Sequence, residues 1–356
     1  MRVVQVLGSS AGGVARHVAQ AVAELSAAGE QVLVGGPLAV RETVLPDGGI
    51  FAPVEITDRP QVGDLTAIRR IAWLARGADV VHAHGLRAGA LAVLAVRIPP
   101  RRDRARLVVT LHNLPVGGRA VRLVSAVLGR VVARGADVVL GVSGDLVELA
   151  RSQGARQSER ALVPAPERRE VSRTPEQTRA ELGLSAEQPL VVTVARLAPQ
   201  KGLDTLVQAA VGLDLPGAVW VLAGDGPLAP SVQEQIDRLG APVRLLGRRF
   251  DVPELFQAAD VVASTAVWEG QPLAVQEALG QGAAVVATDA GGTREVTGDA
   301  AALVPVGDAE TLAREIRAVL TDPTRRDGLR AAARRRAAEL PTAADVLTQL
   351  RAIYAG

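Results

Sequence analysis

Cysteine is absent from the sequence, which excludes disulfide bonds and thiolate metal sites. Aromatic residues are scarce, since the chain has only three Phe, three Trp and one Tyr. Proteins that bind single-stranded nucleic acid use such rings as stacking platforms, so this function is disfavoured. Charge gives no reason to expect nucleic acid either, because the formal net charge is only +2.

Long apolar runs are also missing, and no stretch approaches the length of a membrane span. Residues 1–7 have the pattern of a strand and lack the basic, apolar and small-residue order of a signal peptide. We therefore expect a cytoplasmic protein. Its 356 residues exceed one ordinary hydrophobic core and predict two domains of roughly 170 residues each.

Short apolar runs alternate with helical patterns in both halves of the chain. The first half predicts strands at 3–7, 31–34, 79–85, 107–111 and 138–141, with helices at 14–25, 64–75, 86–96 and 119–134. The second half predicts strands at 190–195, 219–223, 243–246, 261–263, 284–287 and 301–304, then an Arg-rich helical tail. Such alternation is typical of α/β domains in which helices cover both faces of a parallel sheet.

The alternation lapses in a Pro-, Glu- and Arg-rich stretch that ends near residue 187, and this stretch predicts a domain boundary. We expect a first domain at 1–165, a linker at 166–187 and a second domain at 188–340. Loops at the carboxyl ends of the strands in the two domains would face one another across a cleft.

Lysine is nearly absent, since Lys201 is the only lysine among the 40 basic residues. It lies in the loop A-R-L-A-P-Q-K-G after an expected strand, five positions beyond Arg196. Arginine serves at every other basic position, so a lysine at this one position indicates that the loop specifically needs a compact ammonium group. The two cations could neutralise a diphosphate leaving group, each contact being worth roughly 3 kcal/mol. The alternative is a pair of solvated surface cations.

Two acids flank the start of another expected helix, in W-E-G-Q-P-L-A-V-Q-E. Glu269 lies in the turn before Pro272, and Glu277 lies about one turn inside the helix. Both carboxylates could face one crevice, where the free N–H groups of Leu273 and Ala274 would hold an anion. The alternative is an acid-rich helix N-terminus beside an exposed helical Glu.

Three weaker candidates end other strands. The loop G-S-S-A-G-G at 8–13, with Gly12 and Gly13, could cradle phosphate through backbone amides or could serve only tight packing. The tripeptide Gly224, Asp225 and Gly226 is either a turn or a ligand-lining loop. His84 and His112 end neighbouring strands and could hydrogen-bond a ligand or transfer protons, although most such histidines are structural.

The helix expected at 119–134 mixes arginines with apolar residues. Such a helix could lie on an anionic bilayer at the inner face of a membrane, or it could be an ordinary amphipathic helix that packs on the core.

Together, V-A-R-L-A-P-Q-K-G, L-A-G-D-G-P and W-E-G-Q-P-L-A-V-Q-E-A-L-G resemble the nucleotide-sugar-binding half of the family 4 glycosyltransferases. S-A-G-G-V-A-R-H-V and V-V-H-A-H-G resemble the other half of that family less specifically. The resemblance implies the GT-B fold, with two Rossmann-like domains and a final helix at 341–356 that crosses back to the first domain. Many relatives carry Phe-Gly where this chain has Gln271-Pro272, so no particular sugar is implied.

The resemblance further implies retaining, metal-independent transfer of a hexose-type sugar from a nucleotide diphosphate sugar to a hydroxyl of a sugar, a lipid-linked or a small-molecule acceptor. No cofactor is implied, and the absence of Asp-x-Asp agrees with metal independence. By this analogy Arg196 and Lys201 hold the diphosphate, while Glu269 orients sugar hydroxyls and Glu277 bonds the ribose. Gly12 and Gly13 would approach the phosphates or the acceptor, and His112 would lie near the sugar.

Two other functions stay open on the sequence. A nonhydrolysing sugar-nucleotide 2-epimerase shares the fold and would convert the donor without an acceptor. A catalytically silent sugar-nucleotide-binding protein would bind the donor and release nothing. A nicotinamide dehydrogenase is disfavoured, because the glycine spacing does not match the dinucleotide fingerprint.

Overall fold

The structure, a computed structural model, describes residues 1–9, 12–45, 48–57, 61–98, 104–114, 118–165 and 170–356. The chain forms two compact units. The first contains Met1–Pro164 together with Pro341–Gly356, and the second contains Ala165–Leu340. Each unit is built around its own parallel sheet, which confirms the predicted α/β class with two Rossmann-like domains.

The first unit has a seven-stranded sheet in the order β3-β2-β1-β4-β5-β6-β7. The strands are β1 (Arg2–Leu7), β2 (Gln31–Gly36), β3 (Ile50–Pro53), β4 (Val80–His84), β5 (Arg106–Leu111), β6 (Val138–Gly141) and β7 (Ser158–Arg160). β4 lies between β1 and β5, and its register pairs Gln5 with His82 and His84 with Thr110. Because paired residues and residues two apart share a face, these four polar side chains lie together on one face of the sheet.

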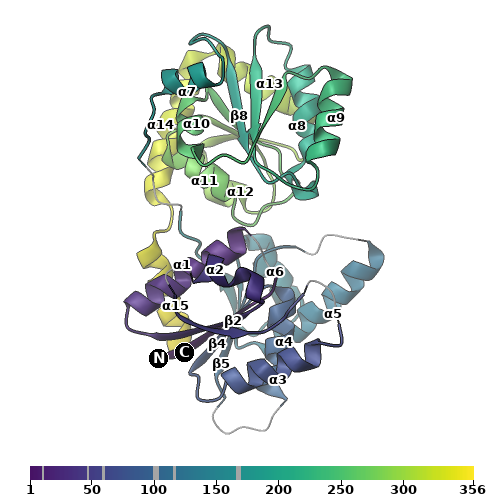
Figure 1. The fold of residues 1–356 in the computed structure, drawn as a ribbon, viewed down its shortest axis with the longest axis vertical. Coiled ribbons are helices and arrows are strands. Elements are labelled where there is room, and N and C mark those ends of the chain that lie inside the picture. The colour runs from purple at the N-terminus through teal and green to yellow at the C-terminus, as the bar shows by residue number, and fades with distance from the viewer. Residues whose placement is uncertain (10–11, 46–47, 58–60, 99–103, 115–117, 166–169) are drawn as a thin grey trace. The chain divides into compact units, whose positions relative to one another are not determined.

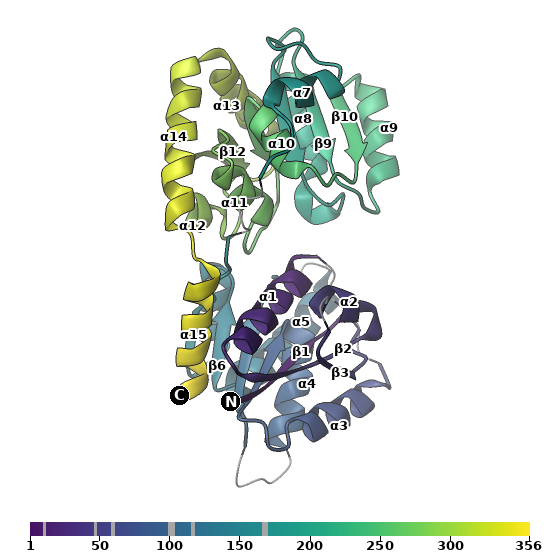
Figure 2. The same cartoon turned by 60° about the vertical axis from the view of Figure 1, so that its left-hand side comes forward.

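Helices cover both faces of this sheet (Figures 1 and 2). They are α1 (Gly13–Ala27), α2 (Arg41–Val44) after the 3-10 turn η1 (Leu38–Val40), α3 (Asp64–Leu74), α4 (Leu86–Arg97), α5 (Arg119–Gly135), α6 (Gly144–Ser152) and α15 (Ala343–Ala355). α1 packs against α15, whereas α3, α4 and α5 pack side by side. Val18 and Leu25 of α1 are fully buried, as the helical spacing of the sequence predicts.

The last helix, α15, belongs to the first unit although it follows the second in sequence. A capping box of Thr342 and Asp345 starts it. Gln349 donates to the carbonyl of Arg160 at 2.7 Å, and Arg351 forms an ion pair with Glu30 at 2.9 Å. These contacts and four buried side chains (Val346, Leu350, Ile353 and Tyr354) fix the helix on the first sheet.

The second unit has a six-stranded sheet in the order β10-β9-β8-β11-β12-β13. Its strands are β8 (Leu190–Val194), β9 (Val219–Ala223), β10 (Val243–Gly247), β11 (Val261–Ser264), β12 (Val285–Thr288) and β13 (Ala301–Val304). Its helices are α7 (Pro175–Glu181), the 3-10 turn η2 (Pro199–Lys201), α8 (Leu203–Gly212), α9 (Ala229–Leu239), α10 (Val252–Ala258), α11 (Leu273–Gly280), α12 (Thr293–Thr297), α13 (Ala309–Thr321) and α14 (Pro323–Glu339).

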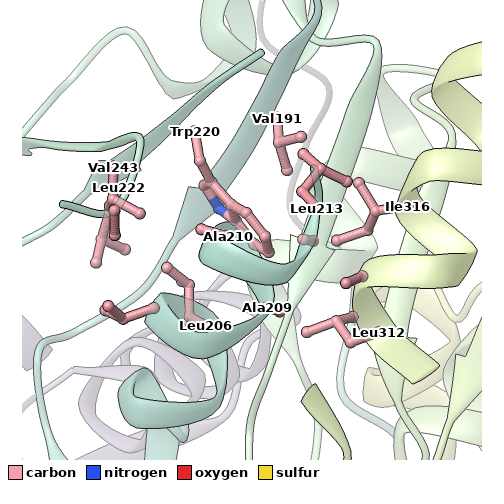
Figure 3. Close-up of a cluster of buried hydrophobic side chains, with 14 of the residues drawn as sticks. Val191, Leu206, Ala209, Ala210, Leu213, Trp220, Leu222, Val243, Leu312 and Ile316 are labelled. Carbon is pink, nitrogen blue, oxygen red and sulfur yellow. The ribbon is translucent and has the colours of Figure 1, made fainter. Parts of the chain in front are cut away.

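Each face of the second sheet has its own hydrophobic core. Under α8, α9 and α13, the indole of Trp220 packs among aliphatic residues such as Leu206 and Ile316 (Figure 3). The Trp220 N–H donates to the Thr193 hydroxyl at 2.9 Å, so burying its one polar group costs little. The other core includes Phe256 from α10 and Val275 from α11. β8 and β11 contribute buried residues to both cores.

The predicted linker at 166–187 differs from the structure. Residues 166–169 lie outside the described residues, but the remainder belongs to the second unit and contains α7. The buried guanidinium of Arg179 anchors α7 through an ion pair with Asp260 at 2.7 Å and bonds to the carbonyls of Ala258 and Gln188. The sequence did not predict this helix, because α7 is anchored by one buried arginine and has no stripe of buried apolar residues.

Candidate functional site

The candidate site begins at the carboxyl end of β8, in the loop 195–202 that carries both predicted cations. Arg196 is exposed, and its side chain makes no hydrogen bond or ion pair within the described part of the chain. Lys201 ends η2, and Gly202 then adopts the left-handed conformation with φ of 58°. A Cβ at Gly202 would lie 2.0 Å from the carbonyl oxygen of Thr265, so only glycine allows this close approach.

The lone lysine and the first of the predicted acids meet. Lys201 Nζ forms an ion pair with Glu269 Oε1, and the Glu269 side chain is buried. Backbone contacts hold the pair, since the Thr265 hydroxyl donates to the Lys201 carbonyl at 2.7 Å and Gln200 donates to the Trp268 carbonyl at 3.0 Å. The loops after β8 and β11 are thus joined at the carboxyl edge of the sheet, where ligands bind in open α/β folds.

Helix α11 starts directly behind Glu269. Pro272 is its N-cap, and the Pro272 carbonyl accepts hydrogen bonds from the N–H groups of Val275 and Gln276 at 2.9 and 3.0 Å. Among the described residues, the N–H groups of Leu273 and Ala274 have no acceptor. The helix therefore presents two backbone donors and the positive end of its dipole.

These groups line one cavity of about 40 Å³ at the ends of β8 and β11. Lys201, Glu269, Leu273 and Ala274 all contribute to its wall, together with residues of both strands. The cavity thus combines an ammonium, a carboxylate and a helix N-terminus, which suits a ligand that carries both negative charge and hydroxyl groups.

Glu277 lies on α11, half-buried, and does not line this cavity. The structure therefore brings only one of the two predicted carboxylates to the cavity. The spacing of eight residues between Glu269 and Glu277 suggested a shared crevice. It could not show that the turn before α11 directs Glu269 toward Lys201. A contact between Glu277 and the ribose stays a prediction.

Gly224 and Gly226 brace the cation loop. A Cβ at Gly224 would lie 1.8 Å from the carbonyl oxygen of Ala195, and one at Gly226 would lie 2.4 Å from that of Leu197. Between them, the Asp225 carbonyl accepts the N–H of Leu197 at 2.7 Å. Close backbone packing thus accounts for both glycines, while a direct ligand contact of this turn stays a prediction.

In the first unit, Gly12 caps α1 with φ of 87° and Gly13 is the first helical residue. A Cβ at Gly12 would meet nothing within 4 Å among the described residues, so conformation rather than space requires glycine there. Residues 10 and 11 of the same predicted loop lie outside the described residues. Phosphate or acceptor binding by this loop stays a prediction.

His84 is the last residue of β4, and His112 directly follows β5. The rings of these two histidines are in contact. His84 Nδ1 lies 3.2 Å from His112 Nε2, and His84 Nε2 lies 2.7 Å from Gln5 Oε1. The other two histidines are close by, because His17 lies 5.4 Å from His112 and His82 lies 4.2 Å from His84, between ring centroids. All four histidines of the chain therefore form one cluster.

Burial keeps these rings neutral. It lowers the pKa of His17 to about 4 and, with His17 nearby, that of His82 to about 3. Burial first, and the neighbouring histidines second, lower the pKa of His84 and His112 well below the usual value. At neutral pH the cluster can donate and accept hydrogen bonds, but it is a poor base.

Sequence reasoning missed two residues beside the predicted histidines and one exposed aromatic residue of the second unit. Gln5 and Tyr354 bond to the histidine cluster from β1 and α15. A signal for each existed, since Gln5 is the one polar residue within the apolar run of residues 3–7 and Tyr354 is the only tyrosine. Phe250 follows β10 and is 78% exposed, with the Arg248 guanidinium 5.3 Å from its ring centroid.

Helix α5 is less buried than a core helix. Its buried residues are Gly129, Val132 and Ala133, all in its second half. Val121, Leu123, Val124 and Val127 are between 44% and 67% exposed. Within the described ranges, no helix is long and apolar enough to cross a membrane, and no three His, Asp or Glu side chains are placed to hold a metal ion.

Two family models match the chain. The model described as "Glycosyl transferase 4-like domain" matches residues 12–166, and the model described as "Glycosyl transferases group 1" matches residues 175–336. The chain belongs to the family 4 glycosyltransferases. Each match covers most of one unit.

Named relatives in this family include LpsE of Rhizobium meliloti, a lipopolysaccharide core biosynthesis glycosyltransferase. It is 31% identical over 155 residues, which are 42% of this chain and 45% of LpsE. The D-inositol 3-phosphate glycosyltransferase of Nocardia farcinica is 31% identical over 285 residues, 72% of this chain and 62% of that protein. Both alignments span less than two thirds of the relative's length.

Solved structures share the fold. HepE of Anabaena, crystallised in complex with UDP, superposes with a TM-score of 0.83 at 23% identity, and the match covers 100% of both chains. The fold of this chain is therefore GT-B.

Proposed function

We propose that this protein is a retaining, metal-independent glycosyltransferase. It moves a hexose-type sugar from a nucleotide diphosphate sugar to an acceptor hydroxyl. The observation that carries the proposal is the cavity at the ends of β8 and β11, where Lys201, Glu269 and the N-terminus of α11 converge.

The diphosphate binds to the positive groups of this edge. Lys201 and the exposed Arg196 supply full charges, and the open N–H groups of Leu273 and Ala274 supply fixed dipoles. Each such contact stabilises the developing charge of the leaving group by roughly 3 kcal/mol. Lys201 can serve both its partner Glu269 and a phosphate oxygen, because an ammonium has three donors.

Glu269 accepts hydrogen bonds from hydroxyls of the donor sugar, and Glu277 bonds the ribose. The buried carboxylate of Glu269 is held in place by Lys201, so its position is set before the sugar arrives. In the first unit, Gly12 and Gly13 offer backbone donors, and His112 bonds a hydroxyl near the anomeric carbon.

Transfer occurs on one face of the sugar. The acceptor oxygen bonds to the anomeric carbon on the side from which the diphosphate departs, and the acceptor proton passes to a departing phosphate oxygen. Because burial holds the pKa of His112 well below its usual value, that ring orients a hydroxyl and does not take its proton at neutral pH. Glu269 is engaged by Lys201 and positions the donor.

Uridine is the base that the proposal favours slightly over guanosine, because the similarly folded HepE was crystallised with UDP. The exposed ring of Phe250 offers a face for the base to stack on. It follows β10, two strands from β8 and therefore about 10 Å away across the sheet, a span that a nucleoside can bridge.

Contact with a membrane that holds the acceptor is a further part of the proposal. The exposed valines and leucine of α5 alternate with Arg119, Arg122 and Arg130, a combination that suits an anionic bilayer surface. Flotation with anionic liposomes tests this contact, and it should fall when the three arginines become Ser. Unchanged flotation would remove membrane contact from the proposal.

A thermal-shift panel of UDP-, GDP- and ADP-sugars tests the donor. A ligand that binds only the folded state raises the melting temperature, so one sugar nucleotide should stand out. With that donor, candidate acceptors should release nucleoside diphosphate without added metal, and NMR of the product should show the anomeric configuration of the donor.

The alternatives give other results in the same assays. A 2-epimerase would convert the donor with no acceptor present. A silent binding protein would shift its melting temperature and release no diphosphate with any acceptor. Inversion at the anomeric carbon would contradict the retaining mechanism.

A further inference from the structure

A buried hydrogen-bonded network lies in the first sheet, on the face covered by α1 and α15. It has two branches that meet at Gln5, which is completely buried. One runs from Gln5 Oε1 to His84 Nε2 at 2.7 Å and from His84 Nδ1 to His112 Nε2 at 3.2 Å. The other runs from Gln5 Nε2 to the Tyr354 hydroxyl at 3.2 Å, and from there to His82 Nδ1 at 2.7 Å.

The first branch determines which ring nitrogen carries the hydrogen, first in His84 and then in His112. An amide carbonyl only accepts hydrogen bonds, so His84 Nε2 must carry the hydrogen that it donates to Gln5. A neutral imidazole has one N–H group, so His84 Nδ1 is a bare acceptor. His112 Nε2 must therefore donate to it, which leaves Nδ1 of His112 as an acceptor as well.

The second branch obeys the same polarity. The Tyr354 oxygen accepts from the Gln5 amide, and its hydroxyl hydrogen is then donated to His82 Nδ1. His82 Nε2 consequently carries a hydrogen and donates to the Thr110 hydroxyl at 2.7 Å. Turning the Gln5 amide over would reverse every bond in both branches, so this one side chain sets the direction of all of them.

Neutral rings are required, because a charged imidazole has two N–H groups and no tautomer. Burial lowers the pKa of His84 and His112 well below 6.5, which keeps both rings neutral at pH 7. The ring of His17 packs edge-on against His112 at an interplanar angle of 66°, and this contact limits rotation of the His112 ring.

We propose that Gln5 is a positioning residue for His112. Acting through His84, its side-chain carbonyl holds His112 with hydrogen on Nε2 and leaves Nδ1 as an acceptor for a substrate hydroxyl. The assignment of that hydroxyl to a sugar rests on the proposed function, whereas the tautomer does not. Gln5 and His112 are 107 positions apart in sequence, and Gln5 reaches His112 only through His84, so its effect on His112 is indirect.

The direct test is an NMR spectrum of tag-free protein labelled with 15N-histidine. Long-range proton–nitrogen correlations separate protonated from bare ring nitrogens, and the four histidines of the chain give eight signals in all. We expect His82, His84 and His112 to be protonated on Nε2 at pH 7. Finding His112 protonated on Nδ1, or as a mixture of both forms, would overturn the proposal in the unaltered protein.

The variant Gln5→Met removes both polar ends at similar volume. His84 and His112 should then become mixtures of the two tautomers, which a merely structural role of Gln5 would not produce. Gln188→Met is the matched control, because the Gln188 side-chain amide donates to the Gly217 carbonyl in the second unit and its loss should leave all eight signals unchanged. Unchanged His84 and His112 signals in folded Gln5→Met would contradict the proposal.

Turnover provides an independent measurement. Gln5→Met should lower kcat by about threefold to tenfold, yet have no further effect when His112 is already Ala, because Gln5 acts only through that ring. Equal losses in both backgrounds would mean that Gln5 acts in another way. If the NMR result is as expected but no sugar nucleotide is turned over, the proposed function fails and the control of His112 by Gln5 stands.

Discussion

At the scale of single residues, the pair of Lys201 and Glu269 shows how the site is assembled. The carboxylate is buried, and its ion-pair partner is the one lysine of the chain. Removing either partner leaves the other without its counter-charge, and the penalty is larger for the more buried group. The pair therefore has a structural effect that can be separated from its effect on catalysis.

A double-mutant cycle tests this separation. Lys201→Met should lower the free energy of unfolding by about 1–3 kcal/mol, because Glu269 loses its partner. Adding Glu269→Gln should recover part of that loss, since the unpaired charge is then gone. Turnover should stay at least about tenfold below wild type in both single variants and in the double variant. Additive changes in denaturant midpoints would show that the two groups are not partners in the folded protein.

Gly202 makes a second prediction, for which the chain contains its own control. Gly202 and Gly240 have nearly the same backbone conformation, with φ of 58° and ψ of 40° and 33°. A Cβ would meet the Thr265 carbonyl at 2.0 Å in the first case and nothing within 4 Å in the second, within the described residues.

Gly240→Ala should therefore cost about 1 kcal/mol, the penalty of a left-handed alanine. Gly202→Ala should cost at least about 3 kcal/mol, because the loop must also move away from Thr265. Urea denaturation of the two variants measures both values. Equal losses would mean that the close approach at Gly202 contributes nothing to stability.

At the residue scale, sequence reasoning depended on unusual residue types and on spacing within recognisable loops. Lys201 was singled out as the lone lysine and Glu269 as the first of two acids eight positions apart, and the structure brings these two side chains into an ion pair that neither pattern predicted. Sequence reasoning could not show that Gln5 and Tyr354 bond to each other, because they meet across 349 positions and no local pattern joins them. It also could not show that Gly224 and Gly226 face backbone carbonyls, since a turn and a binding loop have the same spacing.

At the scale of elements, β4 carries two of the buried histidines and makes stability depend on pH. The usual pKa of histidine is about 6.5, and the unfolded chain has that value. Burial lowers the pKa of His82 to about 3, so below pH 6.5 the unfolded chain takes up a proton that the folded protein refuses. Stability is therefore complete above pH 6.5 and is lost as pH falls toward 3.

Between pH 6.5 and pH 5, His82 alone should lower the free energy of unfolding by about 2 kcal/mol. In His82→Gln this part of the pH dependence should disappear, even if the variant is less stable at both pH values. Urea denaturation at pH 7 and pH 5 measures the difference. The same difference in variant and wild type would show that His82 is protonated in the folded protein as well.

The buried strands were easier to predict than a helix such as α7, which is anchored by the single buried side chain of Arg179. Valine-rich runs such as β1 and β6 are buried on both faces, and such runs have a plain apolar signature. Helix α7 has only Thr178 and Arg179 buried, so its sequence resembles a linker. Helix α5 has the pattern of an amphipathic core helix, yet only the tertiary structure reveals that its first half is exposed.

At the scale of the whole molecule, the two units differ in whether one continuous segment of the chain completes their cores. Both cores of the second unit are completed by elements within residues 165–340. The first unit needs α15 to complete its core. Burial of four side chains of this helix stabilises the fold by about 1.5–3 kcal/mol each.

Residues 165–340 expressed alone should therefore unfold in one cooperative transition and show the thermal shift of the full chain with its sugar nucleotide. Residues 1–164 alone should be largely unfolded at 37 °C and should gain structure when the peptide 341–356 is added. Circular dichroism and calorimetry of the fragments measure both outcomes. A stable fragment 1–164 would contradict the role assigned to α15.

The return of α15 to the first unit also orders events during translation. Ribosomes add about 5–20 residues per second, so the roughly 190 residues after Pro164 take about 10–40 s to make. Through that interval the nascent first unit lacks Tyr354, and the polar network around Gln5 and His82 has one member missing. The first unit, although most of it is made earlier, can complete its native contacts only after residues 341–356 have been made.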